Sequence, residues 1–272
     1  MRVIVCIKQI LKVGRVHLDD HNNLMRAGVP GMMNPADKQA LELALTIKNQ
    51  HPDTEIVALS MGPADFNQSL HQAMALGADR AVLLSSRAFG GADTLATAKT
   101  LVAGIQKLGG ADLILFGSQA QDADTGQVGP LVATKLNLPQ VTYMTDGTVD
   151  QERHLVAHRL VEQAQEEVTV ALPAVGTVSA PDTADEYHYP SLHAIRVSMD
   201  TPVTVWDETD LELAPQEVGL KGSPTVVKRV FSPKQVERKH VQLPASPQQA
   251  VNSLLEQLPV GIDLMEGGTH NE

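Results

Sequence analysis

Residues 34–62 read NPADKQALELALTIKNQHPDTEIVALSMG, a helical pattern that runs directly into a short apolar strand. Asn34 and Pro35 are typical of a helix start, as the N-cap and the first helical residue, and Asp37 suits the first turn. Apolar residues then recur at helical spacing, at Ala40, Leu41, Ala44 and Ile47. The continuous run from Ile56 to Leu59 is expected to form a buried strand.

The same alternation of strand and helix continues on both sides of this stretch. Further buried strands are expected at Val3 to Ile7, Ala81 to Leu84 and Leu113 to Phe116. Further helices are expected at Ala64 to Leu76, which Gly77 ends, and at about Asp93 to Leu108. Strands that alternate with helices predict right-handed crossovers and a parallel sheet. The predicted fold class is therefore α/β, with a Rossmann-like parallel sheet and helices on both of its faces.

The pattern changes after Pro139. Longer and more exposed strands are expected at Val141 to Val149, His154 to Leu160 and Glu167 to Leu172, and a buried strand at Ala174 to Val178. From residue 201 onward the chain is interrupted by prolines and weakly patterned, with one helix expected at Pro247 to Leu258. The sequence thus predicts an α/β domain over residues 1–200 and an extended C-terminal arm over residues 201–272 that packs on a partner.

Composition excludes several classes of function. The formal net charge is −11, which argues against nucleic acid and against an anionic membrane surface as partners. Aromatic residues make up only 3% of the chain, so the core must be built from aliphatic side chains. Cys6 is the only cysteine, which excludes an intrachain disulfide, and its apolar surroundings favour a buried thiol over a reactive one. No apolar run is long enough to span a membrane, so we expect a cytoplasmic protein.

The candidate binding site follows from the position of the strands. Open parallel sheets bind ligands beyond the carboxyl ends of their strands. The stretch after the strand at 113–116 is rich in small, hydroxyl and amide residues and leads into a helix that ends near Leu138. Free N–H groups at a helix start, approached closely past Gly126, would form a cradle for phosphate. Gly126 and Gly129 could equally serve only to shape a tight loop.

Other kinds of site are disfavoured. The first strand is not followed by a G-x-G-x-x-G or Walker motif. Asp122 and Asp124 are expected to bond the backbone, a hydroxyl group or the helix start rather than a metal. We find no nucleophile with a base partner and therefore name no catalytic residue.

Three stretches resemble the beta subunit of electron-transfer flavoproteins: NPADKQALE at 34–42, ALGADR at 75–80 and, most specifically, DADTGQVGP at 122–130. The resemblance covers roughly residues 1 to 200. It implies a fold like that of adenine-nucleotide hydrolases, close to the Rossmann type. It also implies an alpha subunit, whose C-terminal domain holds the FAD that carries electrons.

In this family the beta subunit binds a second adenine nucleotide, which is AMP in ordinary members and FAD in the electron-bifurcating branch. Residues 25–30 (MRAGVP) and 219–224 (GLKGSP) look more like the bifurcating branch, in which NADH donates a hydride to that FAD. The contacts that the resemblance implies fall at Cys6, Asn34, Pro35, Ala36, Asp37, Met61, Gln119, Ala120, Gln121, Asp122, Ala123, Asp124, Thr125, Gly126, Gln127, Val128, Gly129 and Pro130.

The resemblance also implies a recognition loop over residues 187–195, in which Leu192 docks a flavin dehydrogenase. Leu192 could instead pack against its own domain. The lysine run that follows this loop in ordinary members is missing, so the dehydrogenase could be of the acyl-CoA or the lactate dehydrogenase type. The expected low-potential acceptor is ferredoxin or flavodoxin. A rival reading is a self-associating nucleotide-binding protein that carries no electrons, but the long tail and the 187–195 loop argue against it.

Overall fold

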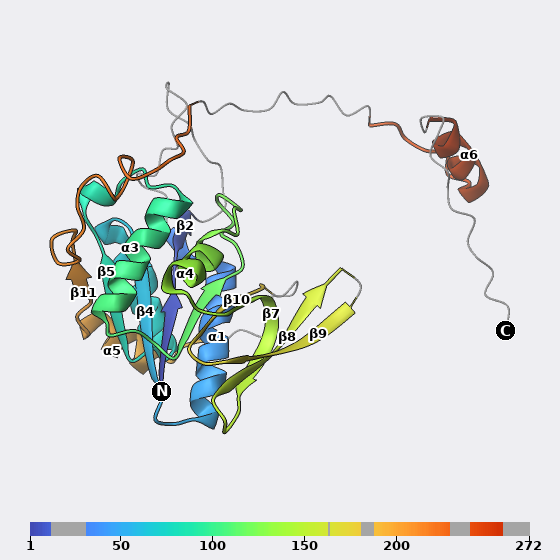
Figure 1. The fold of residues 1–272 in the computed structure, drawn as a ribbon. Coiled ribbons are helices and arrows are strands. Elements are labelled where there is room, and N and C mark those ends of the chain that lie inside the picture. Colours follow the sequence, from blue (N-terminus) through green and yellow to red (C-terminus); the bar gives the residue numbers. More distant parts are fainter. Residues whose placement is uncertain (12–30, 163, 181–187, 229–239, 258–272) are drawn as a thin grey trace. The chain divides into compact units, whose positions relative to one another are not determined.

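The computed structural model describes residues 1–11, 31–162, 164–180, 188–228 and 240–257. The chain divides into two compact units, Met1–Val230 and Phe231–Glu272. The first unit is built around one large sheet, and the helices that pack on it lie on both of its faces (Figure 1).

The large sheet has nine strands in the described residues, in the order β11-β5-β4-β1-β6-β10-β7-β8-β9. The strands from β11 to β7 are parallel, and β8 and β9 extend the sheet as antiparallel strands. Their bounds are β1 Arg2–Cys6, β4 Glu55–Met61, β5 Arg80–Leu84, β6 Leu113–Gly117, β7 Gln140–Val149, β8 His154–Val161, β9 Ala164–Ala171, β10 Ala174–Val178 and β11 Thr204–Trp206. The predicted α/β class with a mostly parallel sheet is confirmed.

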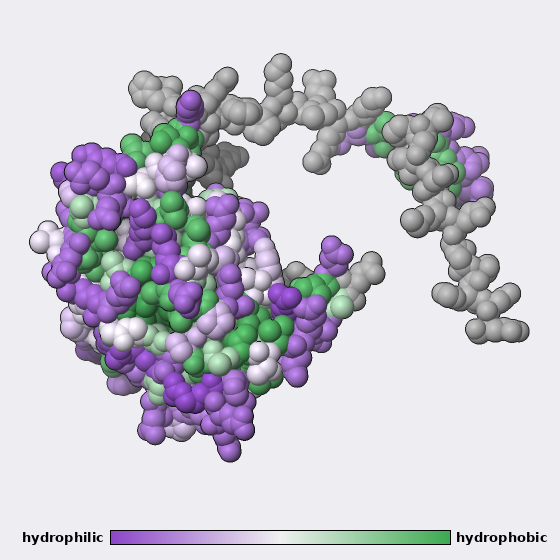
Figure 2. Space-filling model, in the orientation of Figure 1, coloured by the Kyte–Doolittle hydropathy of each residue, from purple (hydrophilic) through white to green (hydrophobic). Residues whose placement is uncertain are grey.

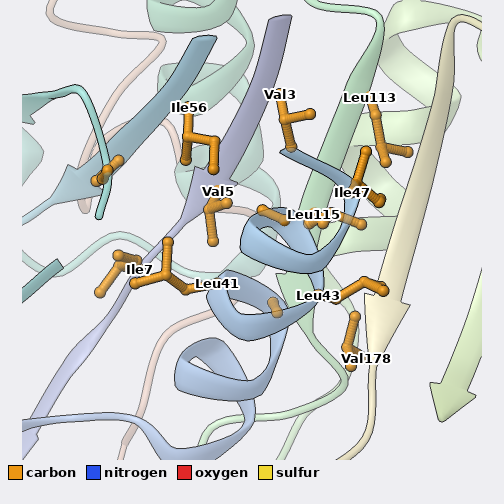
Figure 3. Close-up of a cluster of buried hydrophobic side chains, with 14 of the residues drawn as sticks. Val3, Val5, Ile7, Leu41, Leu43, Ile47, Ile56, Leu113, Leu115 and Val178 are labelled. Carbon is orange, nitrogen blue, oxygen red and sulfur yellow. The ribbon is translucent and has the colours of Figure 1, made fainter. Parts of the chain in front are cut away.

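Side-chain alternation along β1 separates two cores. Val3, Val5 and Ile7 face one way and pack with residues of α1 (Pro35–Gln50) and α2 (Asn67–Leu76). Figure 3 shows this core, with side chains of α1 meeting those of the sheet strands. Ile4 and Cys6 face the other way and pack with α3 (Thr94–Lys107) and α4 (Val128–Leu136). Both faces of the sheet are therefore apolar and covered, as expected of buried parallel strands.

Helix boundaries follow local signals. Asp93 caps α3 by accepting hydrogen bonds from the N–H groups of Leu95 and Ala96, both at 3.0 Å. The expected helix from Ala64 starts as a short 3-10 segment, Ala64–Phe66, before α2 begins, and Gly77 ends α2 as predicted. A second 3-10 segment, Arg87–Phe89, precedes α3.

Two short pairings were not predicted. Strands β2 (Gln9–Leu11) and β3 (Gly31–Met33) form a small antiparallel sheet of their own. Strand β11 extends the large sheet beside β5. Residues 201–228, which we expected to begin an arm, thus start within the first unit, where Leu211 and Val218 are buried in the core.

The second unit contains α6 (Pro247–Gln257), as predicted, and none of the residues of α6 is buried. Its apolar residues Val251, Leu254 and Leu255 are exposed, and apolar residues are visible on its surface in Figure 2. Whether this unit packs on a partner stays a prediction. Among the helices that the structure describes, none is long and apolar enough to cross a membrane.

Candidate functional site

The carboxyl ends of the neighbouring strands β4, β1 and β6 lie along one edge of the sheet. From β1 the chain passes to β4 and β5 on one side and later to β6 and β10 on the other, so the strand order reverses between β1 and β6. Open α/β sheets bind ligands outside the carboxyl ends of the strands at such a reversal. The loops that begin at this edge are residues 7–8 after β1, 62–63 after β4 and 118–127 after β6.

Asn34 holds the loop after β6 in place. Its Nδ2 donates to the carbonyl oxygen of Gln119 at 2.9 Å, and its Oδ1 accepts from the N–H of Gln121 at 3.3 Å. Nδ2 also donates to Asp37 Oδ1 at 3.0 Å. Asn34 stands at the predicted N-cap position, but its side chain makes no capping hydrogen bond because its polar atoms bond the loop and Asp37 instead.

Asp37 joins the ends of two adjacent strands. Its Oδ2 accepts from the N–H of Lys8, after β1, at 2.7 Å, and its Oδ1 accepts from the N–H of Gly117, at the end of β6, at 3.0 Å. Only glycine fits at 117, because a Cβ there would lie 2.3 Å from Asp37 Oδ1. Burial raises the pKa of Asp37 to about 6, although the hydrogen bonds from Lys8, Asn34 and Gly117 act in the opposite direction. The sequence indicated only that Asp37 would suit the first turn of a helix. In the structure its buried carboxylate also joins the ends of β1 and β6.

The start of α4 carries backbone donors that the protein does not use. Helix geometry leaves the N–H groups of the first turn without internal acceptors. In the described part of the chain, the N–H groups of Thr125, Gly126 and Gln127 donate to no acceptor either. Gly126 has φ +60, a conformation that suits glycine. A helix start of this kind, with its positive dipole end, attracts anions such as phosphate.

One carboxylate in the loop is already paired. Lys8 Nζ lies 2.6 Å from Asp122 Oδ1, and both side chains are partly exposed. This pairing was not predicted, because the two residues are 114 positions apart in the sequence. Asp124 has φ +54, and its N–H donates to the carbonyl oxygen of Ala120 at 2.7 Å. The expectation for Asp122 was therefore wrong, since its carboxylate binds a lysine rather than the backbone or a hydroxyl group.

The start of α3 lies beside that of α4, which sequence reasoning missed. Thr94 Oγ1 donates to Gln127 Oε1 at 2.9 Å. Asp93 also accepts from the N–H of Thr225 at 3.1 Å and from its hydroxyl group at 2.8 Å, so the segment that contains residues 219–224 is fastened to this helix start. Asp93 is recognisable as a helix cap from the sequence, but nothing in the sequence indicates its second partner.

The structure brings the expected contact residues to the same end of the sheet, at different depths. Buried ones are Cys6, Asn34, Ala36, Asp37 and Gly129, and half-buried ones are Pro35, Met61, Ala120, Gly126, Val128 and Pro130. Exposed ones are Gln119, Gln121, Asp122, Ala123, Asp124, Thr125 and Gln127. Burial, and secondarily the charge of Asp37, raises the pKa of the Cys6 thiol well above its ordinary value, as expected for an unreactive cysteine.

The expected recognition loop is partly helical. Helix α5 (Leu192–Asp200) begins at Leu192, because Ser191 caps it by accepting from the N–H of Ala194 at 3.1 Å. Leu192 is 86% exposed, so the alternative that it packs against its own domain is wrong. Tyr187 and residues 25–30 lie outside the described residues.

The family model described as "Electron transfer flavoprotein domain" matches residues 22–211, which is more than half of the chain. The chain belongs to the electron transfer flavoprotein family. It is 43% identical over 234 residues to "Caffeyl-CoA reductase-Etf complex subunit CarD" of Acetobacterium woodii, which covers 86% of this chain and 88% of that protein. It is 42% identical over 230 residues to "Electron transfer flavoprotein subunit beta" of Clostridium acetobutylicum, with 84% and 87% covered.

A third relative is "Acryloyl-CoA reductase electron transfer subunit gamma" of Anaerotignum propionicum, 36% identical over 265 residues, with 95% of this chain and 98% of that protein covered. The resemblance to beta subunits of electron transfer flavoproteins is confirmed. Members of an electron transfer flavoprotein complex depend on a bound cofactor for redox chemistry. In the described residues, the unpaired donors at the start of α4 are suited to bind a phosphate group.

Proposed function

We propose that this chain is the beta subunit of a heterodimeric electron-transfer flavoprotein and holds FAD against the loops at the carboxyl edge of the sheet. The observation that carries the proposal is the set of unpaired N–H groups at Thr125, Gly126 and Gln127, directly before α4. They lie at the strand-order reversal between β1 and β6, where phosphate-bearing cofactors bind in related sheets.

The residues around these donors suit the diphosphate group of a nucleotide cofactor. Asn34 bonds the backbone of Gln119 and Gln121 in the loop after β6. Asp37 bonds the backbone of Lys8, after β1, and of Gly117, at the end of β6. The loop therefore does not need to be ordered by the ligand, which lowers the entropic cost of binding. Lys8 lies beside the loop, where its ammonium group is paired with Asp122. In this proposal Asn34 and Asp37 orient the cradle, and the backbone of residues 125–129 contacts the phosphates.

FAD would supply the redox chemistry when bound, by accepting a hydride from NADH and passing single electrons to ferredoxin or flavodoxin and, through the alpha-subunit FAD, to a dehydrogenase. The chain's own part is to hold the nucleotide, orient it towards the alpha subunit and keep the buried thiol of Cys6 out of the chemistry. No side chain in the described residues needs to act as an acid or a base in this scheme.

Structural AMP is the second candidate, because AMP would use the same phosphate donors. One observation favours FAD. The segment with residues 219–224, which resembles the bifurcating branch, is fastened beside the starts of α3 and α4 through Asp93 and Thr225. Two of the relatives are named as subunits that serve CoA-ester reductases. Those names further favour a dehydrogenase of the acyl-CoA type over one of the lactate type.

The experiment that tests the electron route measures ferredoxin reduction by NADH with the purified heterodimer and its dehydrogenase. The proposal predicts that ferredoxin is reduced only when the oxidised substrate of the dehydrogenase is present, because the two electrons of each hydride must leave together on separate paths. If ferredoxin is reduced neither with nor without the oxidised substrate, the complex does not bifurcate electrons and acts as a simple electron shuttle. Purification of the chain as a stable homodimer that needs no alpha subunit would contradict the heterodimer itself.

A further inference from the structure

Glu42 is a buried carboxylate in the middle of α1, and its side chain is only 10% exposed. Its Oε1 accepts from the backbone N–H of His188 at 3.1 Å, and its Oε2 contacts His188 Nδ1 at 2.7 Å. A carboxylate is removed from water at a large cost unless hydrogen bonds compensate for it. His188 supplies this compensation from 146 residues away, while its own side chain is 80% exposed.

The residue after His188 is held by the same helix. Lys38, one turn before Glu42, has its Nζ 5.3 Å from the centroid of the Tyr189 ring, within the range of a cation–π interaction. Tyr189 is 84% exposed, so the contact with Lys38 is a local anchor rather than part of the core. Helix α1 thus fixes two successive residues that stand just before Leu192.

The other end of α5 is anchored on α2. His71 Nδ1 lies 2.7 Å from the carbonyl oxygen of Ser198. Between the two anchors, Leu192 and Ile195 remain exposed by 86% and 37%, and Met199, directly after the second anchor, is 71% exposed. The segment is therefore fixed at its ends, while the side chain at its start contacts almost nothing in its own chain.

We propose that Glu42 is a positioning residue for docking: it fixes His188 so that the exposed Leu192 is presented to the partner dehydrogenase in one conformation. The inference rests on the proposed function and on the docking role that the sequence resemblance implies for Leu192. A surface loop that must be ordered on binding reduces affinity, and ordering it beforehand restores the affinity without any new contact. Glu42 lies five residues after Asp37 on α1 and is not one of the nucleotide contacts named above, so docking is the property that its substitution should change.

The test uses the heterodimer with full-length chains and a flavin dehydrogenase that exchanges electrons with it. Glu42→Leu removes both acceptors but keeps the size and helix propensity of the side chain, so no buried charge or cavity is left. His188→Ala removes the exposed imidazole but keeps the backbone N–H, so the Glu42 carboxylate retains one of its two contacts. Glu42→Gln can keep both contacts, because its amide group can donate to Nδ1 of the other histidine tautomer. Lys48→Leu is the control on the same helix, since it breaks the ion pair with Asp79 and leaves His188 alone.

Each variant is assayed for the KM and kcat of electron transfer to the dehydrogenase, for NADH-dependent dye reduction and for bound nucleotide. We expect Glu42→Leu and His188→Ala to raise the KM for the dehydrogenase on the order of tenfold, as the loss of one good hydrogen bond would. The kcat, dye reduction and nucleotide content should stay unchanged. Glu42→Gln and Lys48→Leu should behave like the unmodified protein.

Leu192→Ala, measured in parallel, separates the inference from the function on which it rests. A higher KM with Leu192→Ala but not with Glu42→Leu would overturn the positioning role and leave docking in place. An unchanged KM in both variants would overturn docking by Leu192 and the inference with it. A fall in kcat or in nucleotide content with Glu42→Leu would also overturn the inference, because it would show a general structural defect.

Discussion

Asn34 Nδ2 donates to Asp37 Oδ1 at 3.0 Å, and through this hydrogen bond the first turn of α1 braces the loop that follows β6. Both residues are buried, and between them they bond the backbone at Lys8, Gly117, Gln119 and Gln121. The carboxyl edge of the sheet is therefore organised by one helix start, before any nucleotide binds. The proposed phosphate cradle depends on this bracing.

The brace should make stability depend on pH through Asp37. Burial raises the pKa of Asp37 to about 6 in the folded chain, against about 3.9 in an unfolded one. The folded state then binds more protons between these values, so the contribution of Asp37 to the free energy of unfolding is fully present below pH 4 and is lost as the pH rises through 6.

Asp37→Asn isolates this contribution, because asparagine does not titrate. We expect the difference in free energy of unfolding between the unmodified protein and the variant to shrink from pH 4 to pH 7, measured by denaturant titration. At pH 4 the variant should be less stable than the unmodified protein by about 1–3 kcal/mol, because its amide group faces the N–H of Lys8. A difference that stays constant over this range would show that Asp37 does not titrate there.

Gly126→Val should weaken nucleotide retention. The φ of +60 at Gly126 strains any β-branched residue, and a side chain at this point blocks close approach to the backbone donors. Gly110→Val is the matched control, because Gly110 has φ +79 and a Cβ added there meets nothing within 4 Å. Gly110 follows the C-terminal end of α3, whereas the start of α3 lies beside the proposed cradle. Both variants should lose roughly 1–3 kcal/mol of stability from strain.

Only the Gly126 variant should lose bound nucleotide, quantified by chromatography of the denatured heterodimer. Full nucleotide occupancy in Gly126→Val would place the cradle elsewhere. Equal loss in both variants would mean that strain, rather than access to the donors, controls retention.

Cys6 should not react in the folded complex. It is 5% exposed, and burial raises the pKa of its thiol, so the reactive thiolate is scarce at neutral pH. After treatment of the native heterodimer with iodoacetamide at pH 8, the tryptic peptide of residues 3–8 should be unmodified, and it should be fully alkylated after unfolding in guanidinium. Rapid alkylation of this peptide in the native complex would contradict the burial of Cys6.

Much of the fold could be predicted because long elements with strong periodicity carry their own signal. The helix from Pro35 and the strands at 3–7, 56–59, 81–84 and 113–116 were found at nearly their observed positions. The three-residue strands β2, β3 and β11 were missed, because three residues cannot display a period and their pairing depends on distant partners. Helix α5 was taken for a loop, although Ser191 is a recognisable cap.

The candidate site was located from the sequence only at the level of loops. Strand order placed residues 119–130 at the carboxyl edge, because that inference needs only the succession of strands and helices. The side-chain bonds that shape the site join residues far apart, such as Asn34 with Gln119 and Lys8 with Asp122, at separations of 85 and 114 positions. Such contacts depend on the three-dimensional packing and leave no local pattern in the sequence.

The most direct test of the central claim, that this subunit holds FAD, is to count nucleotides in the heterodimer. The chain is co-expressed with its alpha subunit, the complex is purified and denatured, and released FAD and AMP are quantified per heterodimer. The account predicts two FAD and no AMP. One FAD and one AMP would contradict it and would leave this chain a structural nucleotide holder in a simple electron shuttle.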